Sequence, residues 1–476
     1  MADRIAVVTM GVKLGHEEKG YTRFRTICQM LRQAGYEVDL ITTSFQHWEK
    51  AQRDRESFPY EMYDFGIVFI DEPGYSRNID PARLVSHAVA AKNLTAYLEH
   101  APAYDLVYAE VPPNDVALSA ARYAESRGIP FVTDVNDLWP EAMRMVLDVP
   151  VVSDVLFSGL ERDAREVYRR ASGVVGTSDE YSMRPFTDCD PSTPRRTVYV
   201  GNDLDEFDAG AREFSPGIAK PDDEFWVTYA GTLGASYDIP TLIRASEILE
   251  AAGFDDIKVK VLGSGPDEDQ LHAQAEGCDC NVEFLGYMPY AQMAAYLTLS
   301  DVTVNSLVRK APQSIVTKVG DYLAAGIPMV NTGSSVEFRD KVIADGFGMN
   351  VEAEDPETLA ACILALHEDR DMRAEMGRNA RHIAKTQFDR KSSYMKIVEL
   401  VDGLLHTEDA PEQGCESGSE AVDGTSGGAV ARADGITPAG IEAAADDARG
   451  EGTAATADGT PARTAGTAGY GMPEGA

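Results

Sequence analysis

The first half of the chain alternates short apolar runs with longer amphipathic ones. Amphipathic stretches such as Tyr21–Ala34, Pro81–Leu98 and Asn114–Arg127 separate most of the apolar runs. This alternation is typical of βα units, in which parallel strands are joined by helices that cover the sheet. The runs that we interpret as buried strands are Arg4–Met10, Glu37–Thr43, Gly66–Asp71, Leu106–Val111, Pro130–Val135, Gly173–Thr177 and Val198–Val200.

The second half of the chain repeats the pattern. Asp238 and Pro240 are suited to start a helix, and Gly253 is suited to end it. The predicted strands are Phe225–Ala230, Ile257–Leu262, Val282–Leu285, Val302–Asn305, Pro328–Asn331 and Met349–Val351. The predicted helices are Pro240–Ala252, Pro266–Gln274, Tyr290–Leu299, Ser314–Ala325, Pro356–Leu366, Met372–Ala384 and Tyr394–Leu405.

The two series predict an α/β protein with two Rossmann-like, doubly wound parallel-sheet domains. A single core stops growing near ~250–300 residues, so a chain of 476 residues calls for at least two domains. Residues 203–223 hold Pro and Gly signals and are interpreted as a linker. We therefore expect domains at 1–205 and 206–375. Because parallel sheets bind ligands at the carboxyl ends of their strands, a cleft between the two domains is expected.

Beyond residue 406 the composition changes to small and acidic residues. Residues 407–476 contain 13 acidic and 3 basic side chains and few large apolar ones. Such a segment cannot bury enough surface to offset the entropy of ordering, which predicts a disordered acidic tail.

The charge of the chain excludes some classes of partner. A net charge of −35 argues against nucleic acid, which is bound through a basic face. No apolar run approaches the ~18–20 residues of a membrane span, and the first residues lack the pattern of a signal peptide. Six scattered cysteines indicate a reducing, cytoplasmic setting without structural disulfides. Cys278 and Cys280 lack the second pair that a zinc site needs, so no metal site is expected.

Two glycine-rich loops follow strands of the second series. Ala230-Gly231-Thr232-Leu233-Gly234 and Gly263-Ser264-Gly265-Pro266 each lie between a strand and a helix. Backbone N–H groups and a helix N-terminus at such a position attract an anion, although ordinary βα turns contain the same residues.

The stretch from Ser314 to Gly326 carries the next group of candidates. Ser314 is suited to cap a helix, Lys318 could offset phosphate charge, and the Asp321 carboxylate could accept hydrogen bonds from both hydroxyls of a ribose. The alternative is an ordinary amphipathic helix with Lys318 and Asp321 in solvent.

These motifs, in this order, resemble those of the family 4 (group 1) glycosyltransferases, which have the GT-B fold. Further matching segments are Val282–Pro289 and, in the first half, Leu138-Trp139-Pro140-Glu141. The resemblance covers the chain from Arg4 to about residue 400. It points to the branch of N-acetyl-fucosaminyl transferases that act in O-antigen and capsule assembly.

The resemblance implies a function for each domain. The domain at 1–205 would face the acceptor, and the domain at 206–375 would bind the nucleotide-sugar donor. Helices within 376–406 would cross back to the first domain. The donor site would include Gly231, Thr232, Gly263, Gly265, Lys318 and Asp321.

The chain departs from the family pattern at three positions. The family has two carboxylates eight positions apart. Here only the second is present, as Asp321, because Gln313 occupies the position of the first. The Arg and Lys expected in the first loop are replaced by Thr232 and Tyr237. Lys318, together with Arg309 and Lys310, could then meet the diphosphate charge, although Arg309 and Lys310 could equally be a solvated basic pair.

In the first domain, the resemblance points to the loop after the first strand and to the residues before Leu138. Gly15 and Gly20 would let the backbone approach the transferred sugar or the acceptor. Asp137 and His16 are the candidate catalytic residues. Asp137 could bind a sugar or acceptor hydroxyl, or it could cap the following turn.

The resemblance implies transfer with retention of configuration, from a UDP-sugar in preference to other donors, without a metal or other cofactor. The acceptor would be a glycan or a polyprenyl-linked sugar at the inner face of the membrane. Peripheral membrane contact is a further hypothesis, based on Arg162, Arg165, Arg169 and Arg170, although acidic neighbours favour a plain surface helix. A nucleotide-sugar epimerase of the same fold and a non-catalytic donor-binding scaffold are the alternatives.

Overall fold

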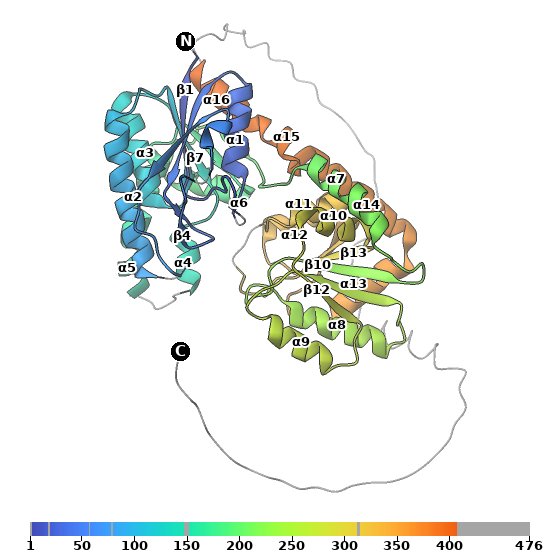
Figure 1. The fold of residues 1–476 in the computed structure, drawn as a ribbon. Helices are drawn as coiled ribbons and strands as arrows, with labels where there is room; N and C mark the ends of the chain where they lie inside the picture. The colour runs from blue at the N-terminus through green and yellow to red at the C-terminus, as the bar shows by residue number, and fades with distance from the viewer. Residues whose placement is uncertain are drawn as a thin grey trace, which may run out of the picture.

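The computed structural model describes residues 2–17, 20–56, 58–77, 80–146, 152–311 and 315–406. The acidic tail at 407–476, predicted to be disordered, lies outside the described residues. The described chain forms two α/β units, each built on a parallel sheet (Figure 1).

The first sheet has seven strands in the order β5-β2-β1-β6-β7-β8-β9, and all its pairings are parallel. Its strands are β1 (Arg4–Val8), β2 (Glu37–Thr43), β5 (Gly66–Ile70), β6 (Leu106–Val111), β7 (Phe131–Val135), β8 (Gly173–Gly176) and β9 (Arg195–Thr197). The strand order reverses between β1 and β6, so the ends of these two strands border a crevice. A small antiparallel hairpin, β3 (Phe45–Gln46) and β4 (Ala51–Gln52), follows β2.

The second sheet has six parallel strands in the order β12-β11-β10-β13-β14-β15. Its strands are β10 (Phe225–Ala230), β11 (Ile257–Leu262), β12 (Val282–Gly286), β13 (Val302–Asn305), β14 (Met329–Asn331) and β15 (Gly348–Asn350). Here the order reverses between β10 and β13. Two doubly wound sheets confirm the predicted fold class.

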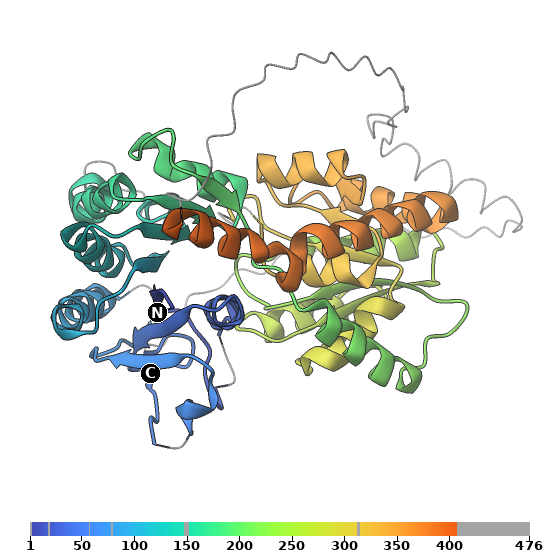
Figure 2. The same cartoon turned by 90° about the horizontal axis from the view of Figure 1, so that it is seen from above.

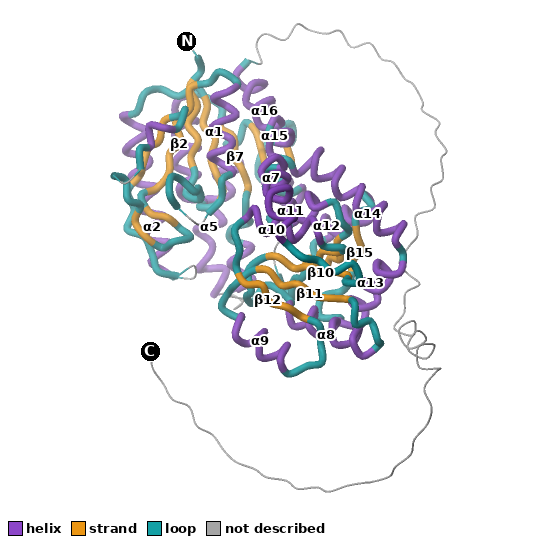
Figure 3. Tube along the Cα trace, turned by 45° about the vertical axis from the view of Figure 1, so that its right-hand side comes forward, coloured by secondary structure: helices purple, strands orange, loops and turns teal. Residues whose placement is uncertain are grey.

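Helices cover both faces of each sheet (Figure 3). In the first unit they are α1 (Arg23–Gln33), α2 (Pro81–His100), α3 (Asn114–Arg127), α4 (Glu141–Val146), α5 (Val152–Arg169) and α6 (Asp179–Met183). In the second they are α7 (Leu204–Phe214), α8 (Ile239–Ala251), α9 (Glu268–Glu276), α10 (Tyr290–Leu299), α11 (Val319–Ala325), α12 (Val336–Ala344), α13 (Pro356–Glu368) and α14 (Arg370–Ile383). The last described helices are α15 (Arg390–Ser393) and α16 (Met395–Leu405).

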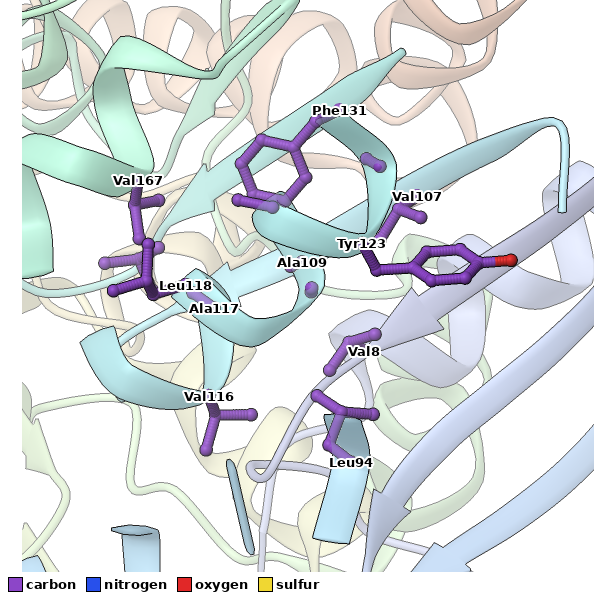
Figure 4. Packing of buried hydrophobic residues seen from close by; sticks show 14 of the residues in the cluster. Val8, Leu94, Val107, Ala109, Val116, Ala117, Leu118, Tyr123, Phe131 and Val167 are labelled. Atoms are coloured by element: carbon purple, nitrogen blue, oxygen red, sulfur yellow. The ribbon is translucent and has the colours of Figure 1, made fainter. Parts of the chain in front are cut away.

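Each sheet has a hydrophobic core on both faces. On one face of the first sheet, residues of β1, β6 and β7 pack against α2, α3 and α5 (Figure 4). On the other face, α1 and α16 supply the cover, and Ile397, Leu400 and Val401 of α16 are buried there. The helix α16, although it follows the second unit in the sequence, therefore belongs to the core of the first unit.

The chain crosses between the two units twice, at residues 198–203 and at the segment between α14 and α16 (Figure 2). The two crossings are bonded to each other. The Arg390 guanidinium donates to the carbonyl oxygens of Val200 (3.1 Å) and Gly201 (2.9 Å). The Asn202 N–H donates to the Phe388 carbonyl at 3.0 Å. This double connection is the structural link between the domains.

Several expectations about local structure are corrected. The segment at 203–223 is no plain linker, because Asp203 caps helix α7 by accepting from the N–H groups of Asp205 and Glu206. Helix α7 packs its apolar face on α10, and the Pro and Gly signals only end it. Strand β9 precedes the predicted Val198–Val200 run, whose residues instead enter the crossing.

The expectation of no disulfide is also wrong. Cys278 and Cys280 are joined by a disulfide in the loop before β12. Their Cα atoms are 5.5 Å apart, which is within the usual range for bridged cysteines even at this short sequence separation.

Candidate functional site

A buried carboxylate lies at the point where the strand order of the first sheet reverses. Glu110 is the penultimate residue of β6, and the chain leaving the adjacent β1 folds over it. Its Oε2 accepts from the Thr9 hydroxyl at 2.5 Å and from the N–H groups of Met10 (3.1 Å) and Gly11 (3.2 Å). Burial raises the pKa of Glu110 to about 7 despite these donors.

Glu110 lines a cavity of about 400 Å³ that opens between the two units. Most of its wall belongs to the first unit, and Thr317 contributes from the second. The turn of the β3–β4 hairpin forms part of this wall through His47 and Trp48. The other side chains with polar atoms that line it are Tyr21, Arg23, Glu72, Tyr75, Arg83, His87, Asn136, Asp137 and Tyr181.

The histidines of this cavity are held neutral. Burial lowers the pKa of both His47 and His87 to about 3, and the nearby Arg83 acts in the same direction. His87 stacks on Trp139, with the ring centroids 5.9 Å apart, and the Arg83 guanidinium lies 4.6 Å from the Trp139 ring. The cavity is thus an aromatic and polar pocket, of the kind that binds hydroxyl-rich ligands.

The structure places the candidate Asp137 in the cavity, and its side chain also fixes the following turn. One carboxylate oxygen accepts from the Leu138 N–H at 2.9 Å, and the other accepts from the Trp139 indole at 3.1 Å. Burial raises its pKa. The structure thus shows the capping of the turn, and the binding of a sugar or acceptor hydroxyl by Asp137 stays a prediction that its place in the cavity wall allows.

The other candidates of the first domain lie around the hairpin. His16 is exposed beside Phe58 and lines a separate pocket of about 230 Å³. Gly15 has a φ of +57° and donates its N–H to the Tyr63 hydroxyl at 3.0 Å. Gly20 has a φ of +122°, and a Cβ there would lie 2.8 Å from the Trp48 ring. Gly20 thus touches the cavity wall, whereas His16 lies apart from it.

The two glycine loops of the second unit pack against each other. A Cβ on Gly263 would lie 1.8 Å from the Gly231 carbonyl oxygen, and one on Gly265 would lie 2.0 Å from that of Leu233. The Leu233 N–H donates to the Ser264 carbonyl at 3.0 Å. The glycines are therefore required for the contact between the loops. Thr232, between them, is exposed at the end of β10.

Lys318 lies beneath the first of these loops. Its Nζ donates to the Tyr229 hydroxyl at 2.8 Å and lies 4.1 Å and 3.8 Å from the centres of the Tyr229 and Tyr237 rings. A Cβ on Gly231 would come within 2.5 Å of this nitrogen. Burial lowers the Lys318 pKa well below its usual value, and no carboxylate of the described residues pairs with it.

Asp321 is bound by the protein itself. Its Oδ1 accepts from the Tyr290 hydroxyl at 2.7 Å and from the Asn202 amide at 3.1 Å, and burial raises its pKa. Helix α11 begins at Val319, not at Ser314, because the chain first turns at Thr317 and Lys318. The candidates Ser314 and Gln313 lie outside the described residues.

The basic pair before this segment points elsewhere. Arg309 donates to the Ala353 carbonyl at 2.8 Å and lies 3.8 Å from the Glu354 carboxylate. Lys310 is exposed. The structure therefore brings Lys318 and Gly231 together but turns Arg309 toward acidic neighbours.

Sequence reasoning missed Glu110 and the hairpin residues that share its cavity. One signal was present: Glu110 is a lone charged residue near the carboxyl end of an apolar strand. The hairpin gave no comparable signal, since its strands have two residues each.

Comparisons with known proteins agree with this arrangement. A model described as glycosyl transferases group 1 matches residues 211–383, and a model described as glycosyl transferase 4-like domain matches residues 21–202. The two matches fall on the second and first sheets, respectively. The chain is a glycosyltransferase, with a 4-like domain in its first unit and a group 1 domain in its second. No curated protein matches it in a sequence search.

Solved structures share the fold of this glycosyltransferase. HepE of Anabaena in complex with UDP has 18% identity and a TM-score of 0.59, over 84% of this chain and 100% of HepE. Sucrose-phosphate synthase of Thermosynechococcus elongatus has 18% identity and a TM-score of 0.62, over 85% and 100%. An enzyme of Listeria monocytogenes described as a UDP-N-acetylglucosamine 2-epimerase has 12% identity and a TM-score of 0.53, over 86% and 98%. These likenesses show the GT-B fold.

Two further features concern the described residues of the glycosyltransferase. None of their helices has the length and apolar character needed to cross a bilayer. Within the same residues, no three His, Cys, Asp or Glu side chains gather in a way that could hold a metal ion.

Proposed function

We propose that the protein transfers a sugar, with retention of configuration, from a UDP-sugar to a glycan or lipid-linked sugar acceptor. The sugar would be a hexose or an N-acetylhexosamine type, as in the N-acetyl-fucosaminyl branch. The acceptor would be a precursor of a surface polysaccharide, handled in the cytoplasm at the inner face of the membrane.

The observation that carries the donor site is the position of Lys318. A buried ammonium without a carboxylate partner is costly, unless a ligand supplies the missing charge. Lys318 lies under the Gly231 loop, next to the point where the order of the second sheet reverses. A diphosphate placed over this loop would meet both the ammonium and the backbone N–H groups. Donor charge would then be offset by the protein without a metal.

Tyr237 supports this role, although it stands where family members carry a lysine. The centre of its ring lies 3.8 Å from the Lys318 ammonium. The Lys318 cation therefore lies on the face of Tyr237, the residue that stands in place of the family's lysine. Lys318 would thus supply, from another part of the chain, the charge that the loop itself lacks.

UDP binding to the full-length protein tests the proposal. Calorimetry with a chelator present should show binding, and Lys318→Met should weaken it at least tenfold, because a desolvated ion pair is worth more than ~1.4 kcal/mol. Lys260→Met is the matched control: Lys260 is also buried, 4.6 Å from the Trp226 ring, but it is paired with Glu283.

Each outcome has a clear meaning. Binding that survives in Lys260→Met and is lost in Lys318→Met supports the donor site. Absence of binding by the unaltered protein, or equal affinity in both variants, would overturn it. Product stereochemistry, determined by NMR of the newly formed glycosidic bond, tests retention separately.

A further inference from the structure

One oxygen of Glu110 takes none of the hydrogen bonds described above. Its Oε2 takes all three donors, and no donor among the described residues reaches Oε1. Both oxygens of Asp137 accept hydrogen bonds, whereas Glu72 resembles Glu110 in that its Oε2 accepts, from the Ser86 hydroxyl at 2.6 Å. Of these two, Glu110 is the one that lies where the strand order reverses, which is where such sheets bind ligands.

The backbone around Glu110 leaves room for such a bond. A Cβ on Gly11 would lie 2.9 Å from Oε1, so any residue other than glycine would crowd this oxygen. Gly11 also lines the cavity, together with the Trp48 ring. Oε1 thus borders the space that a ligand in the cavity would occupy.

The charges around Glu110 leave it able to exchange a proton near neutral pH. Asp134 raises its pKa, but Asp134 is held in a buried bidentate pair with Arg23, at 3.0 and 3.1 Å. The other titratable and charged groups of the cavity are Tyr21, His47, Glu72, Tyr75, Arg83, His87, Asp137 and Tyr181. Burial is the largest cause of the raised pKa, and a proton acceptor works best when its pKa lies near the working pH.

We propose that Oε1 of Glu110 accepts the proton of the acceptor hydroxyl during transfer. The inference rests on the proposed function. The hydroxyl O–H bond breaks and its proton passes to Oε1. A bond forms between the hydroxyl oxygen and the anomeric carbon of the donor, on the same face that the diphosphate leaves, so that the configuration is retained. The bond from that carbon to the diphosphate breaks, and its electron pair leaves with UDP.

The same geometry indicates what class of acceptor enters the cavity. The wall holds the carboxylates of Glu72, Glu110 and Asp137 and the guanidinium groups of Arg23 and Arg83. Because Arg23 is already paired with Asp134, a phosphate placed there would meet more negative than positive charge. A neutral sugar unit instead offers hydroxyl donors to carboxylate oxygens and apolar faces to aromatic rings. The reacting part of the acceptor is therefore an uncharged sugar, and any phosphate it carries lies outside the cavity.

Glu110→Gln is the primary test, because its amide oxygen can still accept from Thr9, Met10 and Gly11. UDP release from UDP-glucose, UDP-galactose and UDP-N-acetylglucosamine is measured with water and with octyl glucoside as acceptors. Asp115→Asn is the matched control, since Asp115 is a buried carboxyl of the same domain, with a pKa raised to about 6, that does not line the cavity.

We expect Glu110→Gln to lower turnover at least tenfold while the Kd for UDP stays within twofold, and Asp115→Asn to change neither. The unaltered protein should lose turnover on acidification, with an apparent pKa near 7, and Thr9→Val should move that pKa upward. If Glu110 had only a structural role, Thr9→Val would not change the apparent pKa of turnover. If Glu110→Gln fails to fold, the shift of the apparent pKa in Thr9→Val still tests the proposal.

The outcomes separate the two proposals. Three results would each overturn the role of Glu110 alone. They are unchanged turnover in Glu110→Gln, an apparent pKa of turnover that Thr9→Val does not move, and UDP binding without turnover of any donor. Failure of the unaltered protein to bind UDP overturns the proposed function itself. Faster release with a phosphorylated sugar than with octyl glucoside would overturn the uncharged acceptor.

Discussion

Two buried ionisable residues stand at equivalent places in the two domains. Glu110 lies where the first sheet reverses its strand order, and Lys318 lies next to the reversal of the second. Burial raises the pKa of the acid and lowers that of the base, so in both cases it favours the neutral form. Buried ionisable groups with shifted pKa values at such places are the pattern expected of groups kept for a ligand.

The pKa of Glu110 predicts a pH-dependent stability. Between about pH 4.5 and 7 the folded protein keeps a proton that the unfolded chain loses, so this group's contribution to the free energy of unfolding falls as pH rises. Glu110→Gln removes that contribution. We expect the variant to gain stability relative to the unaltered protein by about 1–3 kcal/mol between pH 5 and pH 8.

Urea unfolding at the two pH values measures this difference. In a Trp226→Phe background, Trp48 and Trp139 report on the first domain alone, because the chain has three tryptophans. Glu180→Gln, at an exposed position, is the control. A difference between Glu110→Gln and its parent that stays constant with pH would contradict the raised pKa.

At the scale of elements, the β3–β4 hairpin adds to the common α/β fold a part of the cavity wall. Its turn carries His47 and Trp48 over the glycines that follow β1. Trp48 meets Tyr21 edge to face, with the centroids 5.0 Å apart. The hairpin has little backbone pairing of its own, so its position depends on these side-chain contacts.

Gly20→Ala should displace this hairpin. The residue would need a φ of +122°, and its Cβ would clash with the Trp48 ring. Gly35→Ala is the matched control, because Gly35 has a φ of +101° but nothing within 4 Å of its Cβ position. We expect the control to lose about 1 kcal/mol from backbone strain, and Gly20→Ala to lose more.

Thermal unfolding and tryptophan emission check this pair of variants. Gly20→Ala should also shift the emission of Trp48, which Gly35→Ala should leave unchanged. Equal losses of stability in the two variants, with unaltered emission, would show that the Trp48 ring accommodates the added methyl group without a further loss of stability.

The same elements show what the sequence could and could not predict. The run Leu106–Val111 was predicted with its correct ends, because apolar patterning determines a buried strand. The role of Glu110 within it was missed, since its burial depends on the chain after β1, about a hundred residues away. Asp321 was singled out from its place in the stretch Ser314–Gly326, but its partners Asn202 and Tyr290 lie on other elements that only the fold brings together.

At the scale of the whole molecule, a side chain of the second domain caps a helix of the first. The Glu337 carboxylate, at the start of α12, accepts from the N–H groups of Asp179 and Glu180 at 2.8 Å each. Those N–H groups begin α6, where a negative charge is stabilised. This contact joins the domains through residues other than those of the double crossing at Gly201 and Arg390, so it can contribute to the angle between the domains.

Glu337→Ala should therefore favour a more open arrangement. Loss of two charge-assisted hydrogen bonds at an exposed site is worth about 1–2 kcal/mol, which changes the ratio of two domain arrangements by roughly tenfold. Small-angle scattering should show a larger radius of gyration than for Asp340→Ala, a change at an exposed position of the same helix.

The function of the contact follows from where transfer takes place. Glu110 belongs to one domain and Lys318 to the other, so reaction requires an arrangement that brings both to the same substrates. In the proposed donor site, UDP alone would meet only the second domain, so we expect its affinity to stay within twofold in Glu337→Ala. Sugar transfer needs both domains and should slow several-fold. If transfer were unchanged while scattering showed the opening, closure would not limit the rate, and the contact would serve stability alone.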